Sequence, residues 1–236
     1  MMTFKQQQVL VVGGSSGIGE AIATAFVAEG ARVTIASRSL DKLQAAAARL
    51  GDVEVAVLDT ADNQQIEQFF AAHPAWDHIA ISAAQTPGGP VKSLPLDSAY
   101  SAMESKFWGA YRVARAANIA ERGSLTFVSG FLSVRPGKTV LQGAINAALE
   151  SLGRGLALEL SPVRVNTVSP GVIETPLWAG MEDVAREQLF ATLRESLPAK
   201  TLGQPEDVAR AVLFLAGNAY TTGSTVLVDG GGAIKP

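Results

Sequence analysis

The first chemistry that the sequence offers is a glycine-rich loop directly after a short apolar run. The residues VLVV at 9–12 are followed by GGSSGIG, in which Gly13, Gly17 and Gly19 have the spacing G-x-x-x-G-x-G. Glycine allows backbone conformations that a side chain forbids, and bare N–H groups at the start of a following helix can bind a pyrophosphate. A glycine-rich turn between a strand and a helix is also simply a tight turn, so the loop alone leaves both interpretations open.

A second candidate feature ends the next apolar segment, VTIASRS at 33–39. In dinucleotide-binding folds the residue at this place contacts the adenosine ribose, where an acid suits NAD and an arginine suits the 2′-phosphate of NADP. Ser37 occupies the acid position and Arg38 follows it. A guanidinium offers a rigid set of donors to phosphate oxygens, and no carboxylate is present to repel them. The pair favours NADP(H) over NAD(H); the alternative is that Arg38 only solvates a loop.

These groups need a scaffold, and a regular alternation of segments supplies one. Short apolar, β-branched runs stand at 8–12, 32–36, 53–58, 76–82, 124–129, 163–169 and 225–230. Longer alanine- and leucine-rich stretches alternate with them, at 18–30, 39–50, 62–72, 100–120, 144–160 and 205–217. Nearly continuous apolar strands separated by helices are typical of a parallel sheet covered on both faces. We expect an α/β fold with a single doubly wound (Rossmann) parallel sheet of about seven strands and helices on both faces, in one domain spanning 1–236.

Residues typical of helix ends stand at several of the expected boundaries. Gly30 and Gly51 follow helical segments as C-terminal stops, while Ser39 and Asp62 occupy N-cap positions. Pro205 with two acids directly behind it is typical of a first helical turn.

The composition excludes several classes of function. Of 236 residues, 47% are hydrophobic and 17% charged, which suits a globular protein with a large core. A formal net charge of -3 gives no basic stripe, so we expect a small-molecule ligand and neither nucleic acid nor a membrane as partner. No segment has the features of a signal peptide or approaches the roughly 18 apolar residues that span a bilayer, so we expect a cytoplasmic protein.

Disulfide and metal chemistry are also disfavoured. The chain has no cysteine, and its acids and histidines show no metal-ligand spacing. The acids Glu182, Asp183 and Glu187 indicate a solvated helical face, so we expect no metal site. His73 and His78 flank PAWD at a helix-to-strand connection, away from the carboxyl ends of the strands where ligands bind, and we expect both at the surface.

Several longer motifs occur in a fixed order along almost the whole chain. They are VGGSSGIG at 12–19, LDTAD at 58–62, VRVNTVSPGVIETP at 163–176, QPEDVARAVLFLAG at 204–217 and TGSTVLVDGG at 222–231. In these motifs the sequence resembles the short-chain dehydrogenase/reductase family, which usually has threonine where Val12 stands. The resemblance implies a Rossmann fold, a nicotinamide cofactor and a small carbonyl or alcohol substrate.

The resemblance also implies which residues contact the cofactor. Asp59 would meet the adenine amino group, and the segment after the sixth strand would border the nicotinamide and its phosphate. The loop SAAQ at 82–85 keeps the small size of the family's NNAG loop but not its asparagines. The expected NADP(H) contacts are Gly13, Ser15, Ser16, Gly17, Ile18, Gly19, Ser37, Arg38, Asp59, Thr60, Ala83, Ala84, Pro170, Gly171, Ile173 and Thr175.

The positions at which this family carries its catalytic residues hold other residue types here. The family's tyrosine and lysine correspond to Gln142 and Asn146, and its active-site asparagine corresponds to Lys106. Its serine aligns with Gly130 or, with one residue of slippage, with Ser129. Gln142, Asn146, Lys106 and Ser129 are therefore the candidate catalytic residues, at an altered site.

The chemistry of these substitutions limits what the site can do. Gln142 and Asn146 are four residues apart and would project from one face of a helix. In the family the lysine lowers the pKa of the tyrosine, which transfers the proton that accompanies hydride transfer. A glutamine amide can polarise a carbonyl but does not titrate in a usable range. Lys106 and Asn146 look exchanged relative to the family, and we hypothesise that the Lys106 ammonium reaches the site from the opposite wall, to stabilise an alkoxide or act as the acid.

Other interpretations of these segments stay open. Lys106 could be an exposed or interface lysine on a long helix, and Ser129 a capping hydroxyl at a strand end. The segment at about 172–204 would be the substrate lid of this family. Its apolar residues could cover a hydrophobic substrate or, instead, form a subunit interface. These residues are Leu177, Trp178, Met181, Leu189 and Phe190.

The hypothesis that follows is an NADPH-dependent oxidoreductase of carbonyl-reductase type with a non-standard catalytic site. Hydride transfer belongs to the cofactor, so a protein that holds it against a carbonyl can retain part of the rate. The alternative is a catalytically impaired NADP(H)-binding sensor or scaffold. A homodimer or homotetramer is expected through the helices at 100–120 and 140–160, whose small residues could equally pack against the sheet.

Overall fold

The computed structural model describes residues 4–235, and its centre is one parallel sheet of seven strands. The strands lie in the order β3-β2-β1-β4-β5-β6-β7, so the winding reverses between β1 and β4. Their bounds are β1 Gln8–Val12, β2 Arg32–Ser37, β3 Val53–Val57, β4 Trp76–Ile81, β5 Ile119–Val128, β6 Arg164–Pro170 and β7 Thr225–Val228. The predicted doubly wound α/β fold is confirmed.

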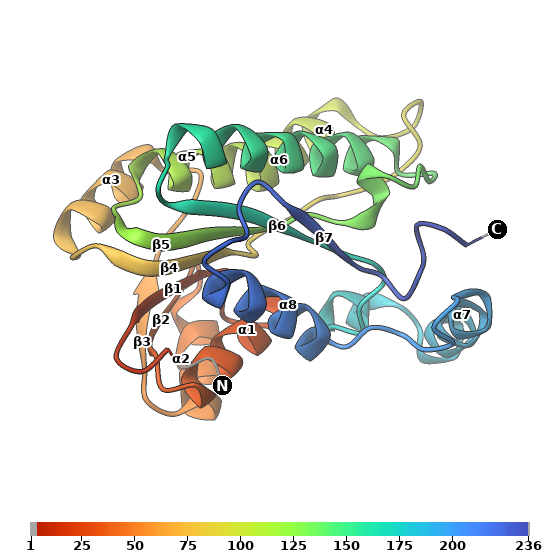
Figure 1. Ribbon diagram of the computed structural model, residues 1–236. Helices are drawn as coiled ribbons and strands as arrows, with labels where there is room; N and C mark the ends of the chain where they lie inside the picture. Colours follow the sequence, from red (N-terminus) through yellow and green to blue (C-terminus); the bar gives the residue numbers. More distant parts are fainter. Residues whose placement is uncertain (1–3, 236) are drawn as a thin grey trace.

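Helices cover both faces of this sheet (Figure 1). One face carries α1 (Gly17–Ala28), α2 (Leu40–Leu50) and α8 (Pro205–Gly217). The other carries α3 (Asn63–Ala72), α4 (Leu96–Met103), α5 (Gly109–Ala116) and α6 (Val140–Glu159). Side chains alternate along β1, so Val9 and Val11 belong to the first core and Leu10 and Val12 to the second. Both faces of this central strand are buried, which is why its residues 9–12 are all apolar.

The helix expected at 100–120 differs from the structure at both ends. It begins earlier, as α4, continues through a π-helical turn, η1 (Glu104–Trp108), and ends as α5 at Ala116. Residues 119–120, expected as helix, are the start of β5, so that strand is longer than the predicted 124–129. A π turn widens a helix by one residue and is frequent at functional sites.

The expected helix boundaries are confirmed. The side chains of Ser39 and Asp62 accept hydrogen bonds from backbone N–H groups in the first turns of α2 and α3. Gly30 and Gly51, after α1 and α2, have φ angles of 82° and 88°, which favour glycine. Pro205 opens α8.

His78 is buried, at 5% exposure, and the expectation that it lies on the surface is wrong. It sits on β4, a central strand covered on both faces, so neither side of the strand meets solvent. Its ring nitrogens pair with Ser124 Oγ at 2.8 Å and Gln7 Oε1 at 3.1 Å. Burial lowers the pKa of His78 to about 4, and the charge of Arg164 acts in the same direction.

The segment 172–204 forms a short 3₁₀ turn, η3 (Pro176–Gly180), and α7 (Asp183–Ser196), beside the carboxyl ends of the strands (Figure 1). Phe190 is buried with Leu197 and Leu202 in a small core of its own, and the Trp178 ring packs edge-on against Phe190. Leu177 and Val184 are exposed apolar side chains of this segment.

Candidate functional site

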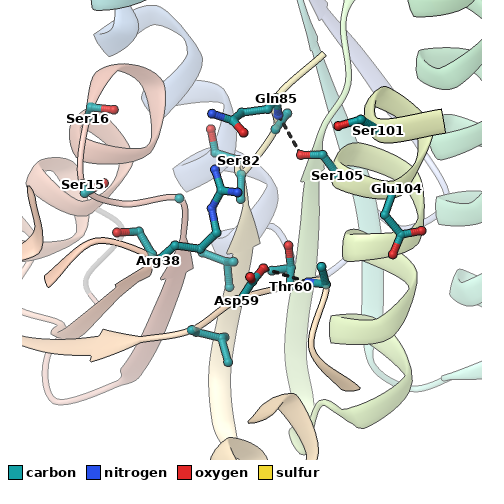
Figure 2. A pocket seen from close by; sticks show the side chains of 17 residues that line it. Ser15, Ser16, Arg38, Asp59, Thr60, Ser82, Gln85, Ser101, Glu104 and Ser105 are labelled. Atoms are coloured by element: carbon teal, nitrogen blue, oxygen red, sulfur yellow. Dashed lines mark hydrogen bonds between the residues drawn. The ribbon is translucent and has the colours of Figure 1, made fainter. Parts of the chain in front are cut away.

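A cavity of about 350 Å³ opens at the carboxyl ends of β1 and β4, where the winding of the sheet reverses (Figure 2). Ligands of open α/β sheets bind at this point of the fold. At Gly13 the backbone packs closely against the loop after β4, because a Cβ on Gly13 would lie 2.5 Å from Ala83 N. Gly13 also has a φ of 88°, so glycine is required here for both reasons.

The start of α1 faces the cavity across the glycine loop. Ser16 is the N-cap of α1 but its side chain makes no capping hydrogen bond, so the first N–H groups of the helix are left without that partner. Gly17 has a φ of 55°, and Gly19 has no room for a Cβ because it packs against the carbonyl of Gly13. Free N–H groups and the helix dipole together suit a phosphate.

Two unpaired donors stand at the end of β2. Ser37 Oγ is buried and has no hydrogen-bond partner, and within residues 4–235 the exposed Arg38 guanidinium forms no hydrogen bond or ion pair. Figure 2 shows Arg38 reaching over the cavity between the glycine loop and Gln85. A buried hydroxyl without a partner is uncommon in folded proteins. Both groups fit the phosphate of an NADP ribose.

The expected cofactor residues divide into two groups. Those that line the cavity are Gly13, Ser15, Ser16, Ser37, Arg38, Asp59, Thr60, Ala83 and Ala84. Those that are not among its lining residues are Gly17, Ile18, Gly19, Pro170, Gly171, Ile173 and Thr175. Thr175 nevertheless borders the glycine loop, since its Cβ lies 3.5 Å from where a Cβ on Gly17 would be.

One wall of the cavity was not anticipated from the sequence. Ser101, Glu104 and Ser105 line it from α4 and η1, and Ser105 Oγ accepts a hydrogen bond of 2.8 Å from Gln85 N (Figure 2). Glu104 pairs with Arg112. No local motif marks these residues, because they reach the site only when the helix folds across the end of β4.

Lys106, on η1, points into the protein and contacts two other candidate residues. Its Nζ donates to the backbone O of Ser129 at 2.7 Å and to Asn146 Oδ1 at 2.7 Å. Burial lowers the pKa of Lys106 to about 8, and the negative charge of Glu150 partly opposes that effect. The amine therefore exchanges protons close to neutral pH.

Gln142 and Asn146 lie one turn apart on α6 and have different partners. Gln142 Nε2 donates to Thr86 O at 2.6 Å, which ties the loop after β4 to α6. Asn146 is buried beside Gly130, where a Cβ would approach Asn146 Nδ2 to 2.7 Å. The structure thus brings Lys106 and Asn146 together, while the amide of Gln142 is engaged by the loop.

Ser129 is buried and bonded to a residue that the sequence did not single out. Its Oγ donates to Glu150 Oε1 at 2.8 Å. Glu150 follows Asn146 by one helical turn, and that spacing from Gln142 and Asn146 was the one signal that could have identified it.

Residues 4–235 contain neither a cluster of metal ligands nor a membrane-spanning helix. No three His, Asp or Glu side chains there are grouped so as to hold a metal ion. None of the helices there combines the length and the apolar character needed to cross a membrane.

Comparison with known proteins relates this architecture to one family. A family model described as Enoyl-(Acyl carrier protein) reductase matches residues 12–232. A short-chain dehydrogenase/reductase of Stachybotrys chlorohalonatus is 34% identical, over 100% of both chains. A crystal structure of a small-chain dehydrogenase in complex with NADPH is 32% identical, with a TM-score of 0.85 over 98% of this chain and 100% of that one. An NADPH-bound short chain oxidoreductase from Pseudomonas aeruginosa PAO1, containing an atypical catalytic center, is 28% identical, with a TM-score of 0.90 over 97% and 98% of the two chains. The chain belongs to the short-chain dehydrogenase/reductase family of oxidoreductases.

Proposed function

We propose that this protein is an NADPH-dependent reductase of carbonyl compounds in which Lys106 replaces the tyrosine of its family as the proton donor. The observation that carries the proposal is the inward-pointing Lys106 amine, which contacts Asn146 and has a pKa of about 8. A general acid works best when its pKa lies near the operating pH.

The cofactor of this proposal is NADP(H), which supplies the hydride when bound. The N–H groups at the start of α1 would hold its pyrophosphate, and Arg38 with the unpaired Ser37 hydroxyl would hold the ribose phosphate. The relation to a dehydrogenase in complex with NADPH supports this choice.

The proton would come from the free donor of Lys106. A lysine ammonium has three N–H donors, and two of them are given to Ser129 O and Asn146 Oδ1. In this proposal the third N–H donates to a substrate oxygen, which takes up the proton as the carbonyl carbon accepts hydride. Gln142 and Asn146 stand where the family has tyrosine and lysine, but neither can supply that proton because a side-chain amide does not titrate in a usable range.

Gln142 would have a supporting role in this site. Its amide holds Thr86 O, so it fixes the loop that closes over the start of α6. The relation to an oxidoreductase that contains an atypical catalytic center is consistent with chemistry that uses other residues than the family's usual set.

The cofactor assignment is tested at Arg38. In Arg38→Leu we expect NADPH to bind about 10- to 100-fold more weakly, the equivalent of a charged hydrogen bond of roughly 1.5–3 kcal/mol, with NADH affinity little changed. Calorimetry or NADPH fluorescence measures both affinities. Arg154→Leu, at an exposed position on α6, is the matched control. Equal NADPH affinity in wild type and Arg38→Leu would refute the assignment.

The proton donor is tested by turnover and its pH dependence. With NADPH and activated carbonyls such as quinones or diketones, Lys106→Met should lower kcat by about 100-fold or more, while Lys42→Met, on the surface of α2, should not. Only the ammonium can donate, so reduction should fall tenfold per pH unit above the lysine pKa of about 8. A rate that stays flat through about pH 9 contradicts the role of Lys106.

The second candidate function is an NADP(H)-binding sensor or scaffold without turnover. It is favoured by the engaged amide of Gln142, which leaves the family's tyrosine position closed by the loop at Thr86. Tight NADPH binding without oxidation of NADPH across the carbonyl panel, and without any effect of Lys106→Met, would support this function.

The proposal includes a homo-oligomer built on α5 and α6 and a substrate lid at 172–204. Tyr111 and Leu158 are exposed apolar side chains on these two helices, and a groove between them is lined by Tyr111, Leu152 and Leu156. Light scattering after gel filtration distinguishes monomer, dimer and tetramer.

A further inference from the structure

The face of α6 that carries Gln142 and Asn146 continues into a buried carboxylate one turn further along, Glu150. Side chains four residues apart on a helix project from the same side. Glu150 is only 6% exposed, and no ion pair to it is present among residues 4–235. Because a buried charge is unfavourable unless it is compensated, its surroundings must stabilise it.

Three hydroxyl groups converge on a single oxygen of this carboxylate. Glu150 Oε1 accepts from Ser129 Oγ at 2.8 Å, from Ser133 Oγ at 2.7 Å and from Ser169 Oγ at 2.9 Å. Ser129 directly follows β5, Ser133 ends the 3₁₀ turn Phe131–Ser133, and Ser169 lies in β6. An ionised carboxylate is an acceptor only, so three donors on one oxygen fit the charged form.

One residue joins this carboxylate to the candidate acid. The Ser129 hydroxyl donates a hydrogen bond to Glu150, and the Ser129 backbone oxygen accepts one of 2.7 Å from the Lys106 ammonium. The second acceptor of Lys106, Asn146, lies one helical turn before Glu150. A buried cation and a buried anion are therefore connected through Ser129 from one side and through α6 from the other.

We propose that Glu150 is a positioning residue for Lys106, whose carboxylate balances the ammonium charge and whose bond to Ser129 fixes the carbonyl that receives the ammonium. This deepens the proposed function, since it explains how the same lysine is kept charged and aimed. The electrostatic effect of Glu150 on Lys106 runs in the required direction, because it raises the pKa that burial lowers.

No other charged group described in the structure shares this role. On η1 itself, Glu104 is paired with Arg112. The segment directly after β5 contributes Ser129 and Gly130, and the loop at 82–86 contributes small or neutral polar residues. From α6 the group that acts on Lys106 is Glu150.

The test removes the charge and keeps the shape. Glu150→Gln retains the length of the side chain and an acceptor oxygen for the hydroxyls, so a merely structural role would leave Lys106 unaffected. We expect the Lys106 pKa to fall by about one unit or more, because burial is then unopposed. NMR titration of protein carrying ¹³Cε-labelled lysine measures it, with the Lys106 signal assigned from Lys106→Met.

One control makes the same Glu-to-Gln substitution at another position of α6, and a second makes a charge-conserving substitution at Glu150. Glu159→Gln, at an exposed position of α6, should leave the Lys106 titration unchanged. Glu150→Asp keeps the charge and should hold the pKa of Lys106 closer to the wild-type value than Glu150→Gln does. A wild-type titration of Lys106 in Glu150→Gln overturns the proposal.

A second measurement applies even when Glu150→Gln folds poorly. That variant leaves an uncompensated buried ammonium, so adding Lys106→Met should raise its melting temperature, measured at about pH 6 where the lysine is charged. A double variant that melts no higher than Glu150→Gln would overturn the proposal.

These readouts need no substrate and are separate from the test of function. A shifted Lys106 titration without any turnover of carbonyls would leave Glu150 as the charge partner and refute the reductase. Turnover that depends on Lys106, with an unshifted Lys106 titration in Glu150→Gln, would support the reductase and refute the role of Glu150.

Discussion

At the scale of single residues, the contact between Lys106 and Asn146 governs what the site can do. The two side chains meet at 2.7 Å although they are 40 positions apart in the chain. The residue types that look exchanged relative to the family are thus neighbours in space, and a lysine at either position can reach the other. The same contact restricts how the family's usual residues could be put back.

We expect Asn146→Lys alone to destabilise the protein, because it places a second ammonium against Lys106. Like charges in a buried site raise the free energy of the folded state, and a melting temperature lower by about 5–10 °C is expected. Adding Lys106→Asn should restore stability, as scanning fluorimetry can check. Gln142→Tyr with Asn146→Lys should therefore gain activity only when Lys106→Asn is also present. An unchanged melting temperature of Asn146→Lys would contradict this prediction, because it would mean that the two ammonium groups do not lie against each other.

At the scale of elements, one arginine at the start of β6 holds the end of α8. The Arg164 guanidinium donates to the backbone oxygens of Leu215, Ala216 and Asn218. The last carbonyls of a helix have no partner within it, and here a buried cation satisfies them. This connection keeps α8 against α1 and the sheet, on the face that supports the glycine loop.

Arg164→Leu should therefore lower the free energy of unfolding by about 2–4 kcal/mol, since it leaves buried carbonyls without donors. Denaturant unfolding measures the change. Arg210→Leu, on α8 itself, is the control: its side chain is 71% exposed and pairs with Asp207, so a loss below about 1 kcal/mol is expected. Equal losses in the two variants would contradict the capping role of Arg164.

At the scale of the whole molecule, the sheet separates two regions of different chemistry. The carboxyl ends of β1 and β4 carry the open cavity with its unpaired donors. Away from that end, His78 packs in one cluster with the rings of Phe4 and Phe26, and burial keeps it neutral. The stability of the fold therefore depends on pH through a residue remote from the site.

We expect stability to fall as the pH is lowered from 6.5, the ordinary pKa of histidine, to the folded value of about 4 for His78. In this pH window His78 becomes protonated in the unfolded chain but stays neutral in the folded protein, which favours unfolding by up to about 3 kcal/mol. Denaturant unfolding at a series of pH values measures the slope. His78→Gln should flatten it, whereas His73→Gln should leave most of it. An unchanged slope in His78→Gln would contradict this prediction.

Local patterns allowed much of the architecture to be predicted. The apolar runs, the glycine spacing and the caps at Ser39 and Asp62 each act within a few residues, so they can be recognised in the chain. The predictions that failed depended on neighbours from elsewhere: the exposure of His78 and the boundary between α5 and β5. The catalytic and cofactor roles of the candidate residues stay predictions.

The sequence by itself determined the order of strands and helices along the chain, the position of the glycine loop, and the absence of a tyrosine at 142 and a lysine at 146. Tertiary structure alone decided that Lys106 meets Asn146, that Gln142 holds the loop at Thr86, and that Glu150 lies behind them both. The reason is that hydrogen bonds between side chains depend on where separate elements cross. Those crossings follow from the packing of the whole sheet and its helices, which no short stretch of sequence contains.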